Sequence, residues 1–114
     1  MILQKLHKTM FQFLTWIWEK DKKKFGEDLP ILLGDMIVLD DGSSSDPALI
    51  EDINKLLEES KTTNATSEYG YELMIKFLLQ YAKRGEGGGI TALIKYLQDN
   101  RKELGQHWLV VWNN

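Results

Sequence analysis

The chain has 114 residues, with 14 Lys plus Arg against 17 Asp plus Glu, two His and no Cys. This length predicts one domain covering residues 1–114, large enough to bury a core without disulfides or a structural metal. The missing Cys exclude disulfide frameworks, thiol catalysis, zinc–thiolate sites and iron–sulfur clusters. Neither a signal-peptide pattern nor a bilayer-long apolar run is found, so the sequence predicts a cytoplasmic protein with no membrane partner.

Charge is distributed unevenly along the chain. Residues 1–24 sum to +4 and residues 61–114 to +2, whereas residues 25–60 hold ten acids and one Lys, a net −9. This acidic stretch would repel a phosphate backbone, which predicts that nucleic acid is not a partner. It would attract a basic protein and speed their encounter. The alternative is an acidic face that contacts only solvent and keeps the chain in solution.

Apolar spacing in the first half predicts helices. Positions 3, 6, 10, 13, 14 and 17 share one face of a helix from Ile2 to about Lys23, which Gly26 can end. Trp16 points away from that face. Asp46–Pro47 starts a second helix reaching about residue 60, because Asp accepts from free amides and Pro has no amide to leave unpaired.

The segment 29–40 is ambiguous. Leu29, Leu32 and Leu33 have helical spacing with Met36, whereas the run from Met36 to Leu39 is also typical of a buried strand. A helix starting near Leu29 is favoured by a preceding Asp cap and a Pro in the first turn. Helix and strand both stay open here.

The second half predicts two more helices and a different ending. Helical spacing covers 68–84 and 90–105, after a polar connector at 61–67 and a glycine-rich turn at 85–89. The tail, His107–Trp112, is β-branched and aromatic, which indicates a short strand or an extended segment lying on the helices. The expected fold is a mainly α, single-domain bundle of about five helices with this short extended or β tail.

The two halves also echo each other, which raises the alternative of two repeated helix–turn–helix units. The segment 10–14 matches 74–78 at an offset of 64 residues, and 29–36 matches 90–97 at an offset of 61. Each half would then be a long helix, a glycine-containing turn and a shorter helix. The match favours a helix for 29–36, since its counterpart is plainly helical.

Motifs that carry chemistry are missing from the sequence. It has no GxxxxGK[ST] phosphate loop, no HExxH and no GxSxG. Asp40 and Glu51 fit the first and last positions of a calcium loop, but the positions between them lack the required acids and Gly. His7 lies on an apolar face and His107 has no neighbour at ligand spacing. We therefore expect no enzyme, no catalytic residues, no cofactor and no metal site.

Aromatic residues suggest a binding protein instead. The four tryptophans are Trp16, Trp18, Trp108 and Trp112, and Trp is a favoured anchor at protein interfaces. The alternative is that they are packed inside the molecule. Trp16 is the exception because it lies off the apolar face of its helix.

Three segments within residues 8–60 carry a family resemblance. They are Met10–x–x–Phe13–Leu14, then Leu32–Leu33–Gly34–Asp35–Met36, then Asp41–Gly42, three serines and Asp46–Pro47–Ala48. In order and spacing, the chain resembles the bacterial CdiI-type immunity proteins, which are encoded beside contact-dependent growth-inhibition toxins.

This resemblance implies stoichiometric neutralisation of a cognate toxin, whose C-terminal domain would be the partner. Toxins of this class are often nucleases with basic clefts, which the acidic stretch would fit as a phosphate mimic. The alternative is an intracellular helical adaptor or regulatory module without toxin specificity. The residues expected to bind the partner are five acids and one anchor: Asp40, Asp41, Asp46, Glu51, Asp52 and Trp16.

Overall fold

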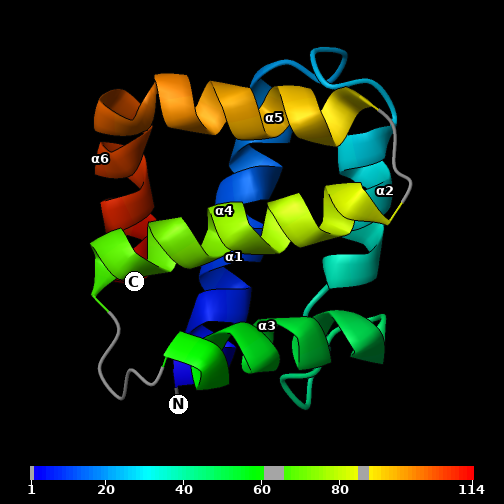
Figure 1. Cartoon of the computed structure of the whole chain (residues 1–114), viewed down its shortest axis with the longest axis vertical. Helices are drawn as coiled ribbons and strands as arrows, with labels where there is room; N and C mark the ends of the chain where they lie inside the picture. The colour runs from blue at the N-terminus through cyan, green and yellow to red at the C-terminus, as the bar shows by residue number, and fades with distance from the viewer. Residues whose placement is uncertain (1, 61–65, 85–87) are drawn as a thin grey trace.

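Two long helices, α1 (Ile2–Lys20) and α4 (Ser67–Lys83), run through the middle of the molecule, with shorter helices around them (Figure 1). The structure is a computed structural model that describes residues 2–60, 66–84 and 88–114. The radius of gyration, 13.1 Å, matches that of a compact chain of this length. The shorter helices are α2 (Asp28–Met36), α3 (Pro47–Ser60), α5 (Gly88–Asp99) and α6 (Arg101–Trp112).

The mainly α prediction is confirmed, but the described residues form six helices rather than about five. The predicted helix over 90–105 is divided at Asn100, whose φ of −114° and ψ of 24° interrupt the helical backbone. The chain resumes as α6, which turns away from α5 (Figure 1). The first helix is also shorter than predicted, because it ends at Lys20 rather than near Lys23.

The prediction of an extended or β tail is wrong. Residues His107–Trp112 are the second half of α6. Leu104, Trp108 and Trp112 are spaced four residues apart and are all buried, so helical geometry places all three on the core side. Their burial outweighs the preference of β-branched and aromatic residues for strands, which is weak and depends on context.

The helix alternative for the segment 29–40 is confirmed, whereas the buried strand over Met36 to Leu39 is wrong, because Ile37 and Leu39 are exposed and this run forms only a single β-bridge. The first part of the segment is α2, which includes Asp28 rather than using it as a cap. The Asp28 carboxylate instead accepts a hydrogen bond of 2.9 Å from the backbone N–H of Gly89 in α5. After Met36 the chain forms a tight hairpin, in which an antiparallel bridge joins Val38 to Ser44.

Side chains cap helix starts in two places, at the predicted Asp46 and at Thr66. The Asp46 carboxylate accepts from the N–H of Ala48 at 3.0 Å in the first turn of α3. The Thr66 hydroxyl accepts from the N–H of Tyr69 at 3.1 Å at the start of α4. Residues 61–65 and 85–87, where most of the predicted connector and glycine turn fall, lie outside the described residues.

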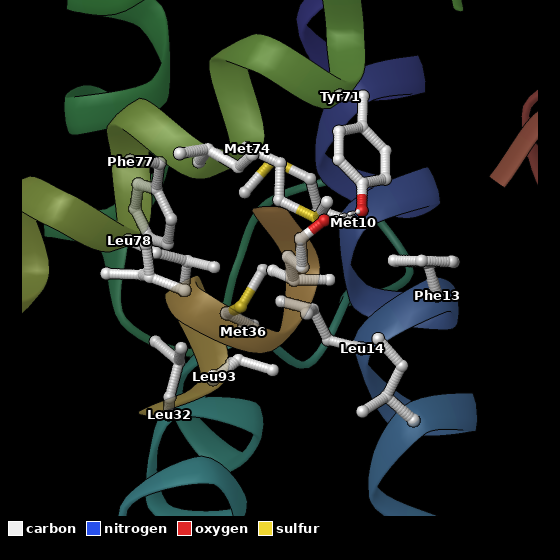
Figure 2. Packing of buried hydrophobic residues seen from close by; sticks show 14 of the residues in the cluster. Met10, Phe13, Leu14, Leu32, Met36, Tyr71, Met74, Phe77, Leu78 and Leu93 are labelled. Carbon is white, nitrogen blue, oxygen red and sulfur yellow. Dashed lines mark hydrogen bonds between the residues drawn. The ribbon is translucent and has the colours of Figure 1, made fainter. Parts of the chain in front are cut away.

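The core is built mainly from the facing sides of the central helices and closed by the outer ones (Figure 2). Side chains of α1, α2, α4 and α5 meet there without solvent exposure above a few per cent. The residues labelled in Figure 2 are Met10, Phe13, Leu14, Leu32, Met36, Tyr71, Met74, Phe77, Leu78 and Leu93.

The helix contacts have a regular plan. Helix α1 packs on α2, α3 and α6, and α4 packs on α5, α6 and α3, while α2 touches α5. Exchanging α1, α2 and α3 for α4, α5 and α6 reproduces these contacts, but a smaller contact between α5 and α6 has no counterpart of similar extent between α2 and α3. Figure 1 shows the same correspondence. The vertical helices α2 and α6 flank α1, and the horizontal helices α5 and α3 flank α4. None of the helices in the described residues is long and apolar enough to cross a membrane.

Candidate functional site

The candidate site is the hairpin of residues 37–46, which projects between α2 and α3. Its backbone is paired by hydrogen bonds from Leu39 N–H to the Ser43 carbonyl at 2.8 Å and from Ser45 N–H to the Ile37 carbonyl at 2.9 Å. Gly42 takes a φ of +84° at the tip, which residues other than glycine rarely adopt. The hairpin therefore holds a defined shape.

Contacts with the helices fix the base of this hairpin. His7 of α1 is fully buried, and its Nε2 atom lies 2.9 Å from the carbonyl oxygen of Met36, the last residue of α2. The N–H of Asp46 donates to the Asp35 carbonyl at 3.0 Å. The buried Ser44 hydroxyl donates to the Asp46 carbonyl. These bonds make the hairpin an extension of the helical scaffold.

Two of the predicted acids lie at the hairpin tip. Asp40 and Asp41 are both exposed. The Asp41 carboxylate accepts from the Ser43 hydroxyl at 2.6 Å and from the Ser43 N–H at 3.0 Å. These hydrogen bonds, the hydroxyl first, lower the pKa of Asp41, so its negative charge persists below the usual range.

Apolar side chains border these acids, a feature that the sequence interpretation missed. Ile37 is 45% exposed and Leu39 is 46% exposed. Val38, Leu39, Asp40 and Asp41 line a shallow hollow in the surface. The sequence signal for this patch is the apolar run before the two acids. That run is also typical of a buried strand, an interpretation that places it in the interior. The hairpin thus combines an apolar patch with two exposed carboxylates.

The remaining predicted acids have different surroundings. Asp46 is half-buried and caps α3, whereas Glu51 is exposed one turn further along that helix. The Asp52 carboxylate forms a 2.7 Å ion pair with Arg84, just after α4, and its side chain is 15% exposed. Asp52 thus joins α3 to the end of α4 and presents little free charge to a partner.

Trp16, the predicted anchor, lies at the contact between α1 and α6 and not at the hairpin between α2 and α3. Its indole stacks on the imidazole of His107 in α6, with ring centroids 3.7 Å apart and planes 16° apart. The Lys20 ammonium lies 4.4 Å from the Trp16 ring centroid. Trp16 therefore joins α1 to α6, and its half-buried ring is already engaged within the molecule.

The other tryptophans divide between core and surface. Trp108 and Trp112 are buried, as the alternative of internal packing predicted. Trp18 is half-buried, with the Lys22 ammonium 4.9 Å from its ring centroid. Among the described residues, no group of three or more His, Asp or Glu side chains is arranged to hold a metal ion.

The partial burial of His107 gives a pH-dependent stability. Burial first, and then the charge of Lys20, lower the pKa of His107 from its ordinary 6.5. The unfolded chain therefore binds this proton more readily than the folded one. The stabilisation is complete above pH 6.5 and declines as the pH falls from there through the folded-state pKa.

We expect the melting temperature of the wild type to fall more between about pH 7.5 and about pH 5 than that of His107→Gln. The glutamine variant keeps a polar side chain but has no proton to gain at this position. Differential scanning calorimetry of both proteins at the two pH values measures the difference. An equal fall in the two proteins would contradict the prediction.

Comparison with known proteins returned no relatives: no protein-family model matches the chain, nor does any curated protein or solved structure. Function must therefore be inferred from the surfaces of the molecule.

Proposed function

We propose that this chain is a CdiI-type immunity protein, which binds the C-terminal domain of a cognate contact-dependent growth-inhibition toxin and blocks it stoichiometrically. The observation that carries the proposal is the 37–46 hairpin, where two exposed apolar side chains border two exposed carboxylates. The binding surface then consists of Ile37, Leu39, Asp40 and Asp41, together with the exposed Glu51 of α3.

Rigidity supports this role for the hairpin. Binding proteins gain affinity when the contact surface is already ordered, because less conformational entropy is lost on association. The backbone pairing across the hairpin and the bond from His7 to Met36 provide that order. An ordered hairpin on a helical scaffold can reach into a cleft that flat surfaces cannot enter.

The charged and the apolar side chains would contribute to binding in different ways. The carboxylates of Asp40 and Asp41 would face cationic groups of the toxin, speeding encounter and fixing orientation. Ile37 and Leu39 would lose contact with water in the complex. Burial of their apolar surface would stabilise the complex without requiring specific contacts. A basic substrate cleft, as in a nuclease, fits this combination.

Three of the six predicted residues have a reduced part in the proposed surface. Asp46 is half-buried and caps α3, and the other two are engaged elsewhere in the fold. Asp52 is paired with Arg84, and Trp16 is stacked on His107. Breaking either contact would cost stability before any new contact with a toxin formed. We assign all three residues to the scaffold and keep the acids at the hairpin tip as the contact.

The decisive experiment is a growth assay in bacteria. The toxin domain of the neighbouring large protein is induced with and without this chain, and its substrate is identified in parallel. Rescue of growth by this chain, with no rescue by an immunity protein of another toxin type, is the expected result. Toxicity that persists while this chain is well expressed would refute the immunity function and favour an adaptor without toxin specificity. The expected site of action is the cytoplasm, where the toxin would reach its substrate.

We also propose that the chain is a duplicated three-helix unit. The offset of 61 residues between 29–36 and 90–97 places α2 over α5, and the exchange of helix contacts supports the same correspondence. Under this proposal α3 corresponds to α6. For the residues of α6 the sequence pattern alone predicts the end of a helix followed by an extended tail. A repeat of this kind would provide two similar helical surfaces, one of which carries the hairpin.

A further inference from the structure

A groove lies between the first turns of α4 and the length of α6. Helix α6 and the start of α4 lie on the side of the molecule away from the loop between α2 and α3 (Figure 1). Its volume is about 550 Å³. The α4 wall carries Ser67, Glu68 and Tyr71, and the α6 wall carries Arg101, Lys102, Gly105, Gln106, Trp108 and Leu109. None of these residues belongs to the surface proposed to bind a toxin.

The floor of the groove is fixed and apolar. Trp108 is buried, and its indole N–H donates to the Ser67 carbonyl at 2.7 Å. The Tyr71 hydroxyl donates to the Leu97 carbonyl at 2.7 Å, and burial raises the pKa of Tyr71 to about 12. Both polar atoms are therefore satisfied from within, and the two rings, which are only 1% and 2% exposed, form a closely packed base beneath the groove.

Gly105 leaves a gap in the α6 wall of this groove. A Cβ atom built at Gly105 would meet no heavy atom within 4 Å. Glycine inside a helix costs about 1 kcal/mol relative to alanine, and no neighbour requires its small size here. One turn later, Leu109 is 45% exposed, with Val110 at 58% beside it. A gap and an exposed apolar side chain thus lie on the same face of one helix.

The charges on the two walls have opposite signs. Lys102 is exposed on α6 and Glu68 is exposed on α4, and neither forms an ion pair with another described residue. Arg101 is already held by an ion pair with Glu72 and lies over the Tyr71 ring. A gap, a projecting side chain and both signs of charge on one surface are the elements that a twofold contact between identical surfaces requires.

We propose that this groove is the interface of a homodimer with twofold symmetry. Leu109 of each copy fills the open space over the partner's Gly105. Glu68 of each copy faces the partner's Lys102. A small residue at the contact lets two helices approach closely, so the two α6 helices pack directly on one another. The partner is a second copy because one surface supplies both halves of each contact.

Sedimentation equilibrium over about two orders of magnitude in protein concentration tests this interface. We expect a monomer–dimer equilibrium in the wild type. Leu109→Asp and Glu68→Lys should each raise the dimer dissociation constant at least about tenfold. The charge-swapped double variant, Glu68→Lys with Lys102→Glu, should restore the dissociation constant to within about threefold of the wild type, since the two signs are exchanged but still opposed.

Two further variants separate the interface from folding. Gly105→Gln fills the gap with a better helix former, so the dimer should weaken while the melting temperature stays equal or rises. Leu79→Asp is the matched control, because Leu79 is 41% exposed on α4 but does not line the groove. A wild type that is monomeric throughout the range would overturn the proposal. So would a charge-swapped variant that stays monomeric, or equal weakening by Leu79→Asp and Leu109→Asp.

Discussion

Replacing Asp40 and Asp41 together by lysine is expected to weaken binding of the toxin domain at least about a hundredfold, which corresponds to about 2.8 kcal/mol. Both carboxylates are exposed at the tip of an ordered hairpin, so they can approach cationic groups without rearrangement of the fold. Reversal of their charge turns attraction into repulsion. Isothermal titration calorimetry with the purified toxin domain measures the change.

Control variants for this experiment come from the same acidic stretch. Glu58 and Glu59 are also adjacent and exposed, but they lie in the last turn of α3. Glu58→Lys with Glu59→Lys changes the net charge by the same amount away from the hairpin. The dissociation constant of this control should stay within about threefold of the wild-type value. Its association should be slower because the overall negative field is weaker. Equal loss in both double variants would mean that net charge alone is responsible, and the hairpin would be refuted as the contact.

Helical periodicity predicted most of this fold because the described chain is mainly amphipathic helix. The face of positions 6, 10, 13, 14 and 17 is buried, as its spacing required. The capping residues Asp46 and Thr66 also act as their chemistry predicts. These features depend on neighbours a few residues apart, which is the information that a sequence displays directly.

The tail escaped prediction because its decisive contacts are distant in the chain. Trp108 bonds to Ser67, 41 positions earlier, and rests against Phe13 and Tyr71. Local preference alone favoured a strand for such an aromatic, β-branched segment. The spacing of Leu104, Trp108 and Trp112 did indicate a helix, but it extended past a helix end that was placed at Gly105.

The candidate site was only partly predictable for a related reason. The two hairpin acids could be selected from charge and motif, but the exposure of Ile37 and Leu39 depends on how the chain leaves α2. The ion pair of Asp52 with Arg84 joins residues 32 positions apart, so no local pattern reveals it. Trp16 was predicted to point away from the core face of its helix, but its half-buried ring packs against the core and stacks on His107 of α6.

Truncating Trp108 to alanine is expected to reduce the free energy of unfolding by about 3–5 kcal/mol. The indole is 1% exposed, packs edge-on against Phe13 and Tyr71 and stacks on Trp112, so the truncation leaves a cavity among large rings. Domains of this size are commonly stable by only about 5–15 kcal/mol, so much of the stability would be lost. Urea unfolding followed by circular dichroism at low micromolar protein measures the change.

A pair of phenylalanine variants separates the hydrogen bond of Trp108 from its packing. Trp108→Phe keeps an aromatic ring but leaves the Ser67 carbonyl without its indole donor, which should cost about 1–3 kcal/mol. The indole N–H of Trp18 is buried and has no partner among the described residues. Trp18→Phe therefore removes an unsatisfied donor and should change stability by less than about 1 kcal/mol. If both variants lost the same free energy of unfolding, the smaller ring alone would explain both losses. The hydrogen bond from Trp108 to Ser67 would then not be what holds α6 against the start of α4.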